Sequence, residues 1–337
     1  MIDFEASRLI RFCIHEVGNQ ENSILKLAKE PVTLDTDLSE LLKTYFLKPF
    51  KGEEFFHIKE SGVIRPAIKS IFEDPSSVHD ISVELAGQLL SSSLSPGIKT
   101  GEFFMVHFTD CQVEDELVDA VGLFKCENKE TYLKVFPEQD KFDLKIDQGI
   151  NINRIDKGAL ILNVEQEEGY LVQVIDRTNQ DGAAYWKDAF LRLEERVDEY
   201  HHTQNYIHMC RDFAMEEMST TNRGEQLGLM TEAVNYFQEN DHFDHEEFKR
   251  QVIREPEIIE AFEDYSKSYE LENHLNSIDD FDISSQAVKR NKKFTRSVIK
   301  LDKNFHIYVH GSRERIKRGY DEQTGLNFYQ VFFEEEK

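Results

Sequence analysis

Alternating apolar and polar residues predict β-strands through the first half of the chain. Over residues 8–17, Ile10, Phe12 and Ile14 share one parity, which is typical of a half-buried strand. Short runs rich in Val, Ile, Phe, Tyr and Leu then occur at 103–110, 118–127, 131–136, 142–147, 158–164 and 170–176. Because no helical pattern separates these runs, they favour an antiparallel meander over βαβ units.

Helical spacing appears on both sides of these strands. Asp37 with Glu40 three residues later has the pattern of a capping box, and predicts a helix that ends at Pro49. Asp74-Pro75 has the pattern of an N-cap followed by proline in the first turn, which predicts the start of a second helix.

From about residue 182 to 271 the apolar period is helical. One stripe begins at Trp186, and Asp244 with Glu247 predicts the capped start of another helix. Pro256 is placed to begin a further helix. We interpret these stripes as core-facing surfaces rather than as cofactor sites.

The last fifty residues return to a strand pattern. Residues 297–302 and 305–310 predict a hairpin, and 326–333 predict a third strand. The predicted fold class is therefore α+β, with a mixed N-terminal domain containing an antiparallel sheet (1–180), a helical middle segment (181–285) and a small C-terminal antiparallel β unit (286–337).

Composition narrows the class of protein. The chain has 337 residues, and its four cysteines are scattered without a CxxC pair, which argues against a disulfide framework and a zinc knuckle. No signal-peptide pattern and no apolar run long enough to span a bilayer is visible. We expect a cytoplasmic protein with no membrane partner.

Charge is strongly segregated along the chain. The formal net charge is −25. Residues 287–319, the C-terminal basic segment, contain eleven Lys and Arg against Asp302 and Glu314, so that 11 − 2 = +9. The remainder therefore carries −25 − 9 = −34. This asymmetry favours a polyanionic partner for the segment, since an evenly spread charge of −25 would repel nucleic acid.

The segment predicts contacts to phosphates rather than to bases. Helix-turn-helix, RNP and C₂H₂ signatures are absent, so we expect double-stranded DNA bound by its backbone. Alternation in the hairpin puts Lys300, His306, Tyr308 and His310 on the face opposite the core, where Tyr308 could stack. The predicted nucleic-acid-binding residues are Lys289, Arg290, Lys292, Lys293, Arg296, Lys300, Tyr308, Arg313, Arg315, Lys317 and Arg318.

Other interpretations of these charges stay open. The basic segment could dock against the protein's own acidic body or an acidic protein. The −34 outside it is typical of an interaction protein that engages a basic DNA-handling partner, for instance a topoisomerase. The sequence leaves the oligomeric state open.

Catalytic motifs give little support to an enzyme. GxGxxG, GxxxxGK[ST], GxSxG and HExxH are absent, and we expect no cofactor and no metal site. One alternative is a metal-dependent nuclease, in which Asp119 and Glu127 would hold Mg²⁺ and Lys129 would polarise the attacking water. Short ExK matches are common by chance in a chain this rich in Glu and Lys.

Several phrases resemble the NdpA-type (YejK-like) bacterial nucleoid-associated family. They are KTYFLKPFK (43–51), VDAVGLFKCENKETYLKV (118–135), YWKDAFLRL (185–193), VIKLDKNFHIYVHG (298–311) and RIKRGYDEQTGLNFYQVFF (315–333). The resemblance covers nearly the whole chain. It implies enrichment in the nucleoid and association with DNA, without an enzymatic activity or a catalytic residue to carry over.

Overall fold

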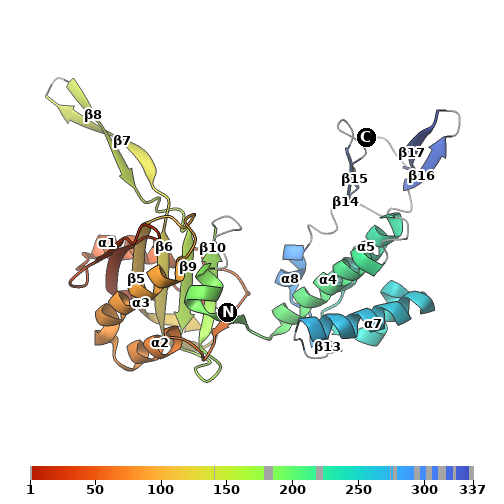
Figure 1. Cartoon of the computed structure of the whole chain (residues 1–337), viewed down its shortest axis with the longest axis horizontal. Helices are drawn as coiled ribbons and strands as arrows, with labels where there is room; N and C mark the ends of the chain where they lie inside the picture. The colour runs from red at the N-terminus through yellow and green to blue at the C-terminus, as the bar shows by residue number, and fades with distance from the viewer. Residues whose placement is uncertain are drawn as a thin grey trace. The chain divides into compact units, whose positions relative to one another are not determined.

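The computed structural model describes residues 2–139, 141–177, 185–217, 223–273, 275, 279–291, 297–300, 306–309, 316–321 and 324–333. The chain divides into two compact units, Met1–Arg196 and Val197–Lys337 (Figure 1). Large antiparallel pairing in the first unit and helices in both confirm the α+β class.

A nine-stranded sheet forms the centre of the first unit. Its order is β11 (Leu193–Glu195), β4 (Phe56–Ile58), β10 (Leu171–Asp176), β9 (Lys157–Leu162), β6 (Glu116–Cys126), β5 (Gly101–Val113), β2 (Arg8–Val17) and β3 (Leu25–Leu27), with β1 (Ile2–Asp3) also on β5. All of its pairs are antiparallel. Four of the six predicted strands of the meander lie here, as β5, β6, β9 and β10.

Helices cover both faces of this sheet. On one face pack α2 (Ile64–Glu73), α3 (Val78–Ser92) and the π-helical turn η2 (Tyr185–Leu191), and on the other packs α1 (Thr36–Leu47). Residues of β5 therefore alternate between two cores: Phe103 belongs to the first and Phe104 to the second. A strand buried on both faces reads as a continuous apolar run, which is the pattern of residues 103–106.

The predicted half-buried strand at 8–17 is β2, but its burial differs from the prediction. Phe12 and Cys13 are both buried, in different cores, whereas Ile10 is 46% exposed. The register of β2 against β5 shifts between Leu9 and Arg11, so a single alternation does not hold along the strand.

Two predicted helix starts can be compared with their caps. The cap of α1 is Asp35, whose carboxylate accepts a hydrogen bond from the Leu38 N–H at 2.8 Å, so the prediction of Asp37 was two residues late. Asp35 has the extended backbone that an N-cap needs, whereas Asp37 lies inside the first turn. Asp74 is an N-cap, as predicted. It caps the short helix η1 (Pro75–Ser77), which leads into α3.

The remaining two strands of the predicted meander are not part of the sheet. β7 (Glu130–Glu138) and β8 (Lys141–Gly149) pair only with each other among the described strands, and Figure 1 shows them extending away from the sheet of the same unit. β6 pairs directly with β9 across this insertion. We call β7–β8 the arm.

The second unit is mainly helical. It contains α4 (Glu199–Glu216), α5 (Arg223–Glu239), α6 (His245–Phe248), η4 (Lys249–Ile253), α7 (Pro256–Glu272) and α8 (Ser285–Asn291), with the small pair β12 (His242–Asp244) and β13 (Asp280–Asp282). Asp244 caps α6 and Pro256 begins α7, as predicted. Tyr206, Phe243 and Phe262 lie in its aromatic core. Trp186, by contrast, packs in the core of the first unit.

Two further pairs of strands follow in the second unit. β14 (Ser297–Lys300) pairs with β15 (His306–Val309), and β16 (Ile316–Asp321) pairs with β17 (Leu326–Val331). The predicted strand at 326–333 corresponds to β17, which pairs with β16 in a second hairpin. β16 was not predicted from the sequence because Ile316–Asp321 lacks an alternation of apolar and polar residues and contains the adjacent basic residues Lys317 and Arg318.

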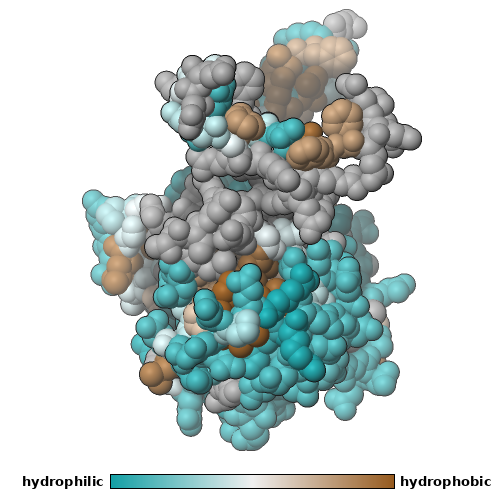
Figure 2. All heavy atoms as spheres, turned by 90° about the vertical axis from the view of Figure 1, so that its right-hand side faces the viewer, coloured by the Kyte–Doolittle hydropathy of each residue, from teal (hydrophilic) through white to brown (hydrophobic). Residues whose placement is uncertain are grey.

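One face of the described residues is largely polar. On the face seen in Figure 2, hydrophilic residues predominate and hydrophobic residues form small separate patches. Within the described part of the chain, every helix is too short or too polar to cross a membrane.

Candidate nucleic-acid interface

The C-terminal basic segment begins on α8. Lys289 and Arg290 occupy its last turn, where basic side chains interact favourably with the helix dipole, and both are exposed. The Arg290 guanidinium donates a hydrogen bond to the Tyr200 hydroxyl oxygen at 2.8 Å. Arg290 is thus tied to α4.

The first predicted hairpin is present, and its register agrees with the predicted alternation. Lys300 lies opposite His306, and Tyr308 lies opposite Val298, in the antiparallel pair β14–β15. Three of the four residues predicted to share a face, Lys300, His306 and Tyr308, thus fall at register positions of one parity. The fourth, His310, lies outside the described residues.

Two more predicted residues fall on the second hairpin. Lys317 lies opposite Gln330, and Arg318 lies opposite Tyr329, in the register of β16–β17. The segment therefore carries basic residues on one helix and on strands of two separate hairpins. The other predicted contacts lie outside the described residues; they are Lys292, Lys293, Arg296, Arg313 and Arg315.

The residues of the nuclease alternative do not converge. Asp119 and Glu127 are eight residues apart along β6 and just beyond its end, a separation of roughly 26 Å at about 3.3 Å per residue. One Mg²⁺ needs its ligands at about 2.1 Å, so these two carboxylates cannot share an ion. Asp119 instead contacts His107 Nε2 at 2.9 Å, and Lys129 pairs with Glu102. No group of three metal-ligating side chains occurs among the described residues.

Sequence reasoning missed a buried ionic network in the first unit. Lys125 of β6 and Lys157 of β9 are direct cross-strand partners, and neither side chain is exposed. Like charges placed opposite each other repel, so each lysine needs a carboxylate. Lys125 Nζ lies 3.1 Å from Glu127 Oε1, and Lys157 Nζ lies 2.8 Å from Asp176 Oδ1.

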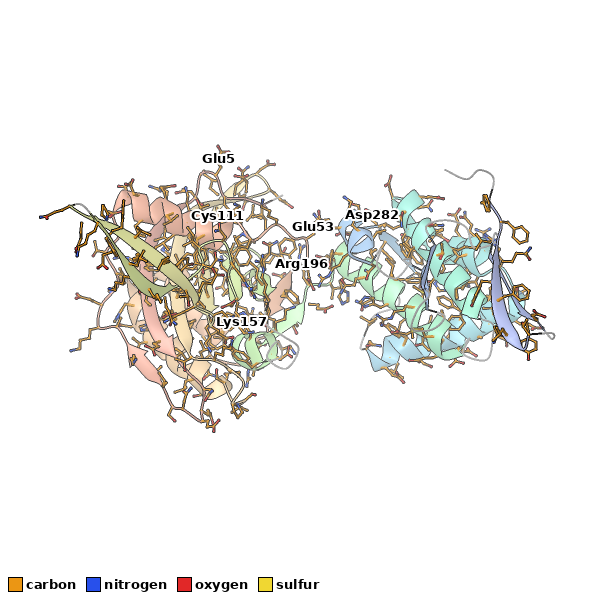
Figure 3. The ribbon with its side chains drawn as sticks, turned by 90° about the horizontal axis from the view of Figure 1, so that it is seen from above. Glu5, Glu53, Cys111, Lys157, Arg196 and Asp282 are labelled. Carbon is orange, nitrogen blue, oxygen red and sulfur yellow. The ribbon has the colours of Figure 1, made fainter. Side chains whose placement is uncertain are left out.

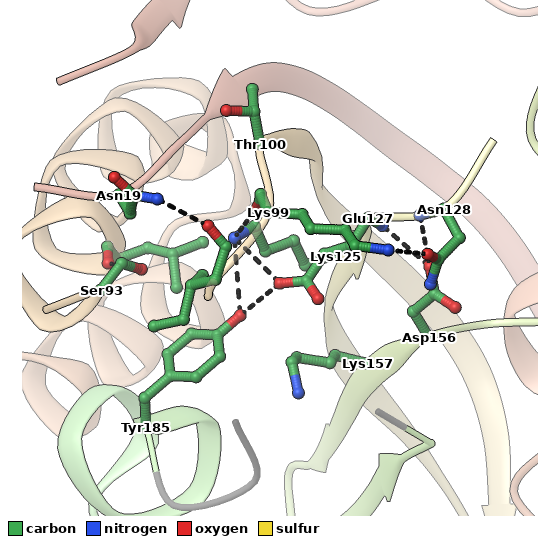
Figure 4. A network of polar contacts seen from close by, with 12 residues as sticks. Asn19, Ser93, Lys99, Thr100, Lys125, Glu127, Asn128, Asp156, Lys157 and Tyr185 are labelled. Carbon is green, nitrogen blue, oxygen red and sulfur yellow. Dashed lines mark hydrogen bonds and ion pairs between the residues drawn. The ribbon is translucent and has the colours of Figure 1, made fainter. Parts of the chain in front are cut away.

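Tyr185 of η2 closes the network over both lysines (Figure 4). Its hydroxyl donates to Glu127 Oε1 at 2.7 Å, and its ring centroid lies 5.5 Å from Lys125 Nζ and 5.0 Å from Lys157 Nζ. Burial, reinforced by the Glu127 carboxylate, raises the pKa of Tyr185, so the phenol keeps the proton that it donates. Burial also lowers the pKa of Lys125, and Glu127 opposes that shift.

The same network anchors the base of the arm. The Asp156 carboxylate accepts hydrogen bonds from the backbone N–H groups of Glu127 and Asn128, each at 2.8 Å, where the chain leaves β6 for β7. These cations are paired within the protein, so we assign the network to holding β6, β9 and η2 together and not to ligand binding. The network was hard to predict from the sequence, because an isolated Lys in a predicted strand is usually a solvent-facing residue.

The last residues of the first unit are also tied to its sheet. Arg196, labelled in Figure 3, forms an ion pair with Glu165, which in turn contacts His57 Nε2 at 2.7 Å. Because His57 lies in β4 and pairs opposite Glu194 of β11, this contact fixes the edge of the sheet where the first unit ends.

Comparison with known proteins places this architecture in one family. A search of curated proteins found no match to the chain. The family model described as nucleoid-associated protein YejK matches residues 13–325, which includes most of the nine-stranded sheet, the helical part and all of the C-terminal basic segment. With the match extending over nearly the whole sequence, the chain belongs to this family of nucleoid-associated proteins.

Proposed function

We propose that the chain binds double-stranded DNA, largely without sequence preference, through its C-terminal basic segment. The observation that carries this proposal is the charge of +9 in residues 287–319, against −34 in the rest of the chain. Membership of a nucleoid-associated family supports it and favours a location in the nucleoid rather than an enzymatic role.

The physical basis is counterion release. Lys and Arg side chains that neutralise phosphates release condensed cations from the duplex, which gives affinity without reading bases. The acidic body repels DNA at long range, so productive encounters require the basic segment to meet the duplex first. An exposed Lys289 and the register positions of Lys300, Lys317 and Arg318 are compatible with such contacts.

A salt titration tests the proposal. The dissociation constant for a fluorescent duplex is measured by anisotropy over a series of salt concentrations, with two unrelated sequences of equal length. With about 5 to 8 phosphate contacts, log K should fall with log salt at a slope of roughly −4 to −7. A flat response, or a strong difference between the two sequences, contradicts the proposal.

Charge reversal locates the contacts. Changing Arg313, Arg315, Lys317 and Arg318 to Glu removes four contacts, which should flatten the slope by about 3 to 4. The matched control makes the same change in net charge at four exposed lysines of the first unit: Lys29, Lys51, Lys59 and Lys69. Equal losses in the two variants would mean that overall charge, and not the C-terminal basic segment, governs binding.

A second candidate function rests on the other half of the charge asymmetry. The −34 outside the basic segment favours engagement of a basic DNA-handling protein, for which a topoisomerase is one example. Pull-downs with and without nuclease treatment separate the two candidates, because a partner bridged by DNA is lost when the DNA is digested. A partner that survives digestion, and is released by salt, supports the direct interaction.

A further inference from the structure

The arm has one face made entirely of apolar side chains. In the antiparallel register of β7 and β8, three consecutive cross-strand pairs lie on this face: Leu133 with Ile146, Val135 with Leu144, and Pro137 with Phe142. We call these six residues the apolar face of the arm. The intervening pairs, which include Lys134 with Lys145 and Phe136 with Asp143, form the opposite face.

This apolar face is open in the single chain. The exposed fractions are 62% for Leu133, 55% for Val135, 73% for Phe142, 60% for Leu144 and 71% for Ile146. An isolated two-stranded hairpin is marginally stable in water, because one of its faces has nothing to pack on. Monomeric proteins seldom leave a contiguous apolar surface of this size uncovered.

The charged residues of β7 and β8 all lie on the face opposite the apolar face. On the opposite face Lys134 Nζ contacts the Asp147 carboxylate, and Lys141 Nζ lies 3.6 Å from Glu138 Oε2. The apolar face has no ionisable group, so it offers nothing to attract DNA, a basic protein or an acidic protein. Its complement must be another uncharged apolar surface.

We propose that the apolar face of the arm binds the same face of a second copy of the chain. An isologous pair about a twofold axis brings each apolar row against its own image, as two packed sheets interdigitate in a sandwich. At about 200 Å² per large apolar residue, the five exposed fractions give roughly 600 Å² per copy, or about 1,200 Å² in total. That is the lower limit of stable protein–protein interfaces, and contacts of Pro137 and the flanking residues add to it.

The position of the arm also suits it to this role, because the rest of the chain is acidic. The body of each copy is strongly acidic, so two bodies repel each other. Figure 1 shows the arm extending away from the sheet of its own unit, which lets two arms meet at a distance from the two sheets. The inference is independent of the proposed function, because the arm contains none of the residues proposed to bind DNA.

Light scattering coupled to size exclusion tests the pairing. We expect the full chain to elute with twice its mass of 39.5 kDa. Changing Leu144 and Ile146 to Lys on the apolar face should give a monomer. The matched control changes Tyr132 and Phe136 to Lys on the opposite face and should remain a dimer. Since none of these four side chains belongs to a buried core cluster, both variants should keep the wild-type circular dichroism spectrum.

A crosslinking experiment identifies the contacting face directly. The four native cysteines are all buried, so a cysteine placed on the arm is the accessible thiol of the chain. Leu144→Cys should form a disulfide-linked dimer under mild oxidation, whereas Lys145→Cys on the opposite face should not. A wild-type chain that stays monomeric up to about 100 µM, or equal crosslinking at the two positions, overturns the inference and assigns the apolar face to a different protein.

Discussion

His15 is a buried histidine held in its neutral form by three neighbours. Its side chain lies in β2, where the Ala28 N–H donates to Nδ1 at 3.1 Å. Nε2 therefore carries the proton and donates to Ser82 Oγ at 2.8 Å, while the Ser82 hydroxyl donates to the His79 carbonyl oxygen at 2.6 Å. A second proton on the ring would break the bond from Ala28. Burial, with a smaller contribution from nearby His79, lowers the pKa of His15 to about 4.

The lowered pKa of His15 predicts that the folded protein loses stability in mild acid. In the unfolded chain His15 binds a proton near its ordinary pKa of about 6.5, so between pH 6.5 and 4 the unfolded state holds more protons than the folded state. The free energy of unfolding should therefore fall as pH is lowered through this window. Between pH 7 and 5 the wild type should lose about 2 kcal/mol more than His15→Gln. Urea denaturation at both pH values measures the difference, and parallel losses in the two proteins would contradict the assignment.

At the scale of elements, the sequence predicted the positions of the strands better than it predicted which strands pair with each other. Runs such as 103–110 identified β5 because consecutive apolar residues, as in 103–106, require a strand covered on both faces. Leu133, Val135, Leu144 and Ile146 alternate as in any half-buried strand. Alternation cannot tell a face packed on the chain's own core from a face left for a second molecule, so the arm was placed in the sheet.

Close approach of backbones explains another feature that residue patterns do not reveal. Gly169, in the turn between β9 and β10, has a positive φ of 121°, and its carbonyl oxygen accepts a hydrogen bond from the Ile58 N–H of β4. A Cβ at this position would lie 2.3 Å from the Ile58 carbonyl oxygen. Only glycine lets the turn pack this closely on β4.

A pair of glycine substitutions tests this packing. Gly169→Ala should lower the free energy of unfolding by about 2 kcal/mol or more, since backbone must move. Gly87→Ala is the control: it lies in α3 with nothing within 4 Å of its Cβ position, so it should raise stability by roughly 0.5 to 1 kcal/mol. Equal effects of the two changes in urea denaturation would refute the argument from close approach.

At the scale of the whole molecule, the two units have separate cores. The buried clusters of the first unit contain no residue beyond Leu193, and the aromatic cluster of the second contains none before Tyr206. The sequence located the charge asymmetry and the first C-terminal hairpin. It missed the buried pairing of Lys125 and Lys157, because Lys157 comes beside Lys125, and Asp176 beside Lys157, only when β9 pairs with β6 and β10.

Separate cores predict that the first unit folds alone. Trp186 is the single tryptophan of the chain and is fully buried in the first unit, so its fluorescence reports on that unit specifically. A fragment of residues 1–196 should show a cooperative urea transition at the same midpoint, by Trp fluorescence, as the full chain at equal chain concentration. It should also fail to bind duplex DNA. A non-cooperative transition in the fragment would show that the second unit is needed for the first to fold, and a shifted midpoint would show that the second unit changes its stability.

The apolar face of the arm has one more consequence, for avidity. A dimer joined through its two arms carries two C-terminal basic segments. Binding of the first segment to a duplex therefore raises the effective concentration of the second segment near the same duplex. Linkage of this kind strengthens attachment by about 10²- to 10⁴-fold without any new contact. Changing Leu144 and Ile146 to Lys should therefore weaken binding to long duplexes, although these substitutions add positive charge. Binding to duplexes too short for two basic segments should be almost unchanged.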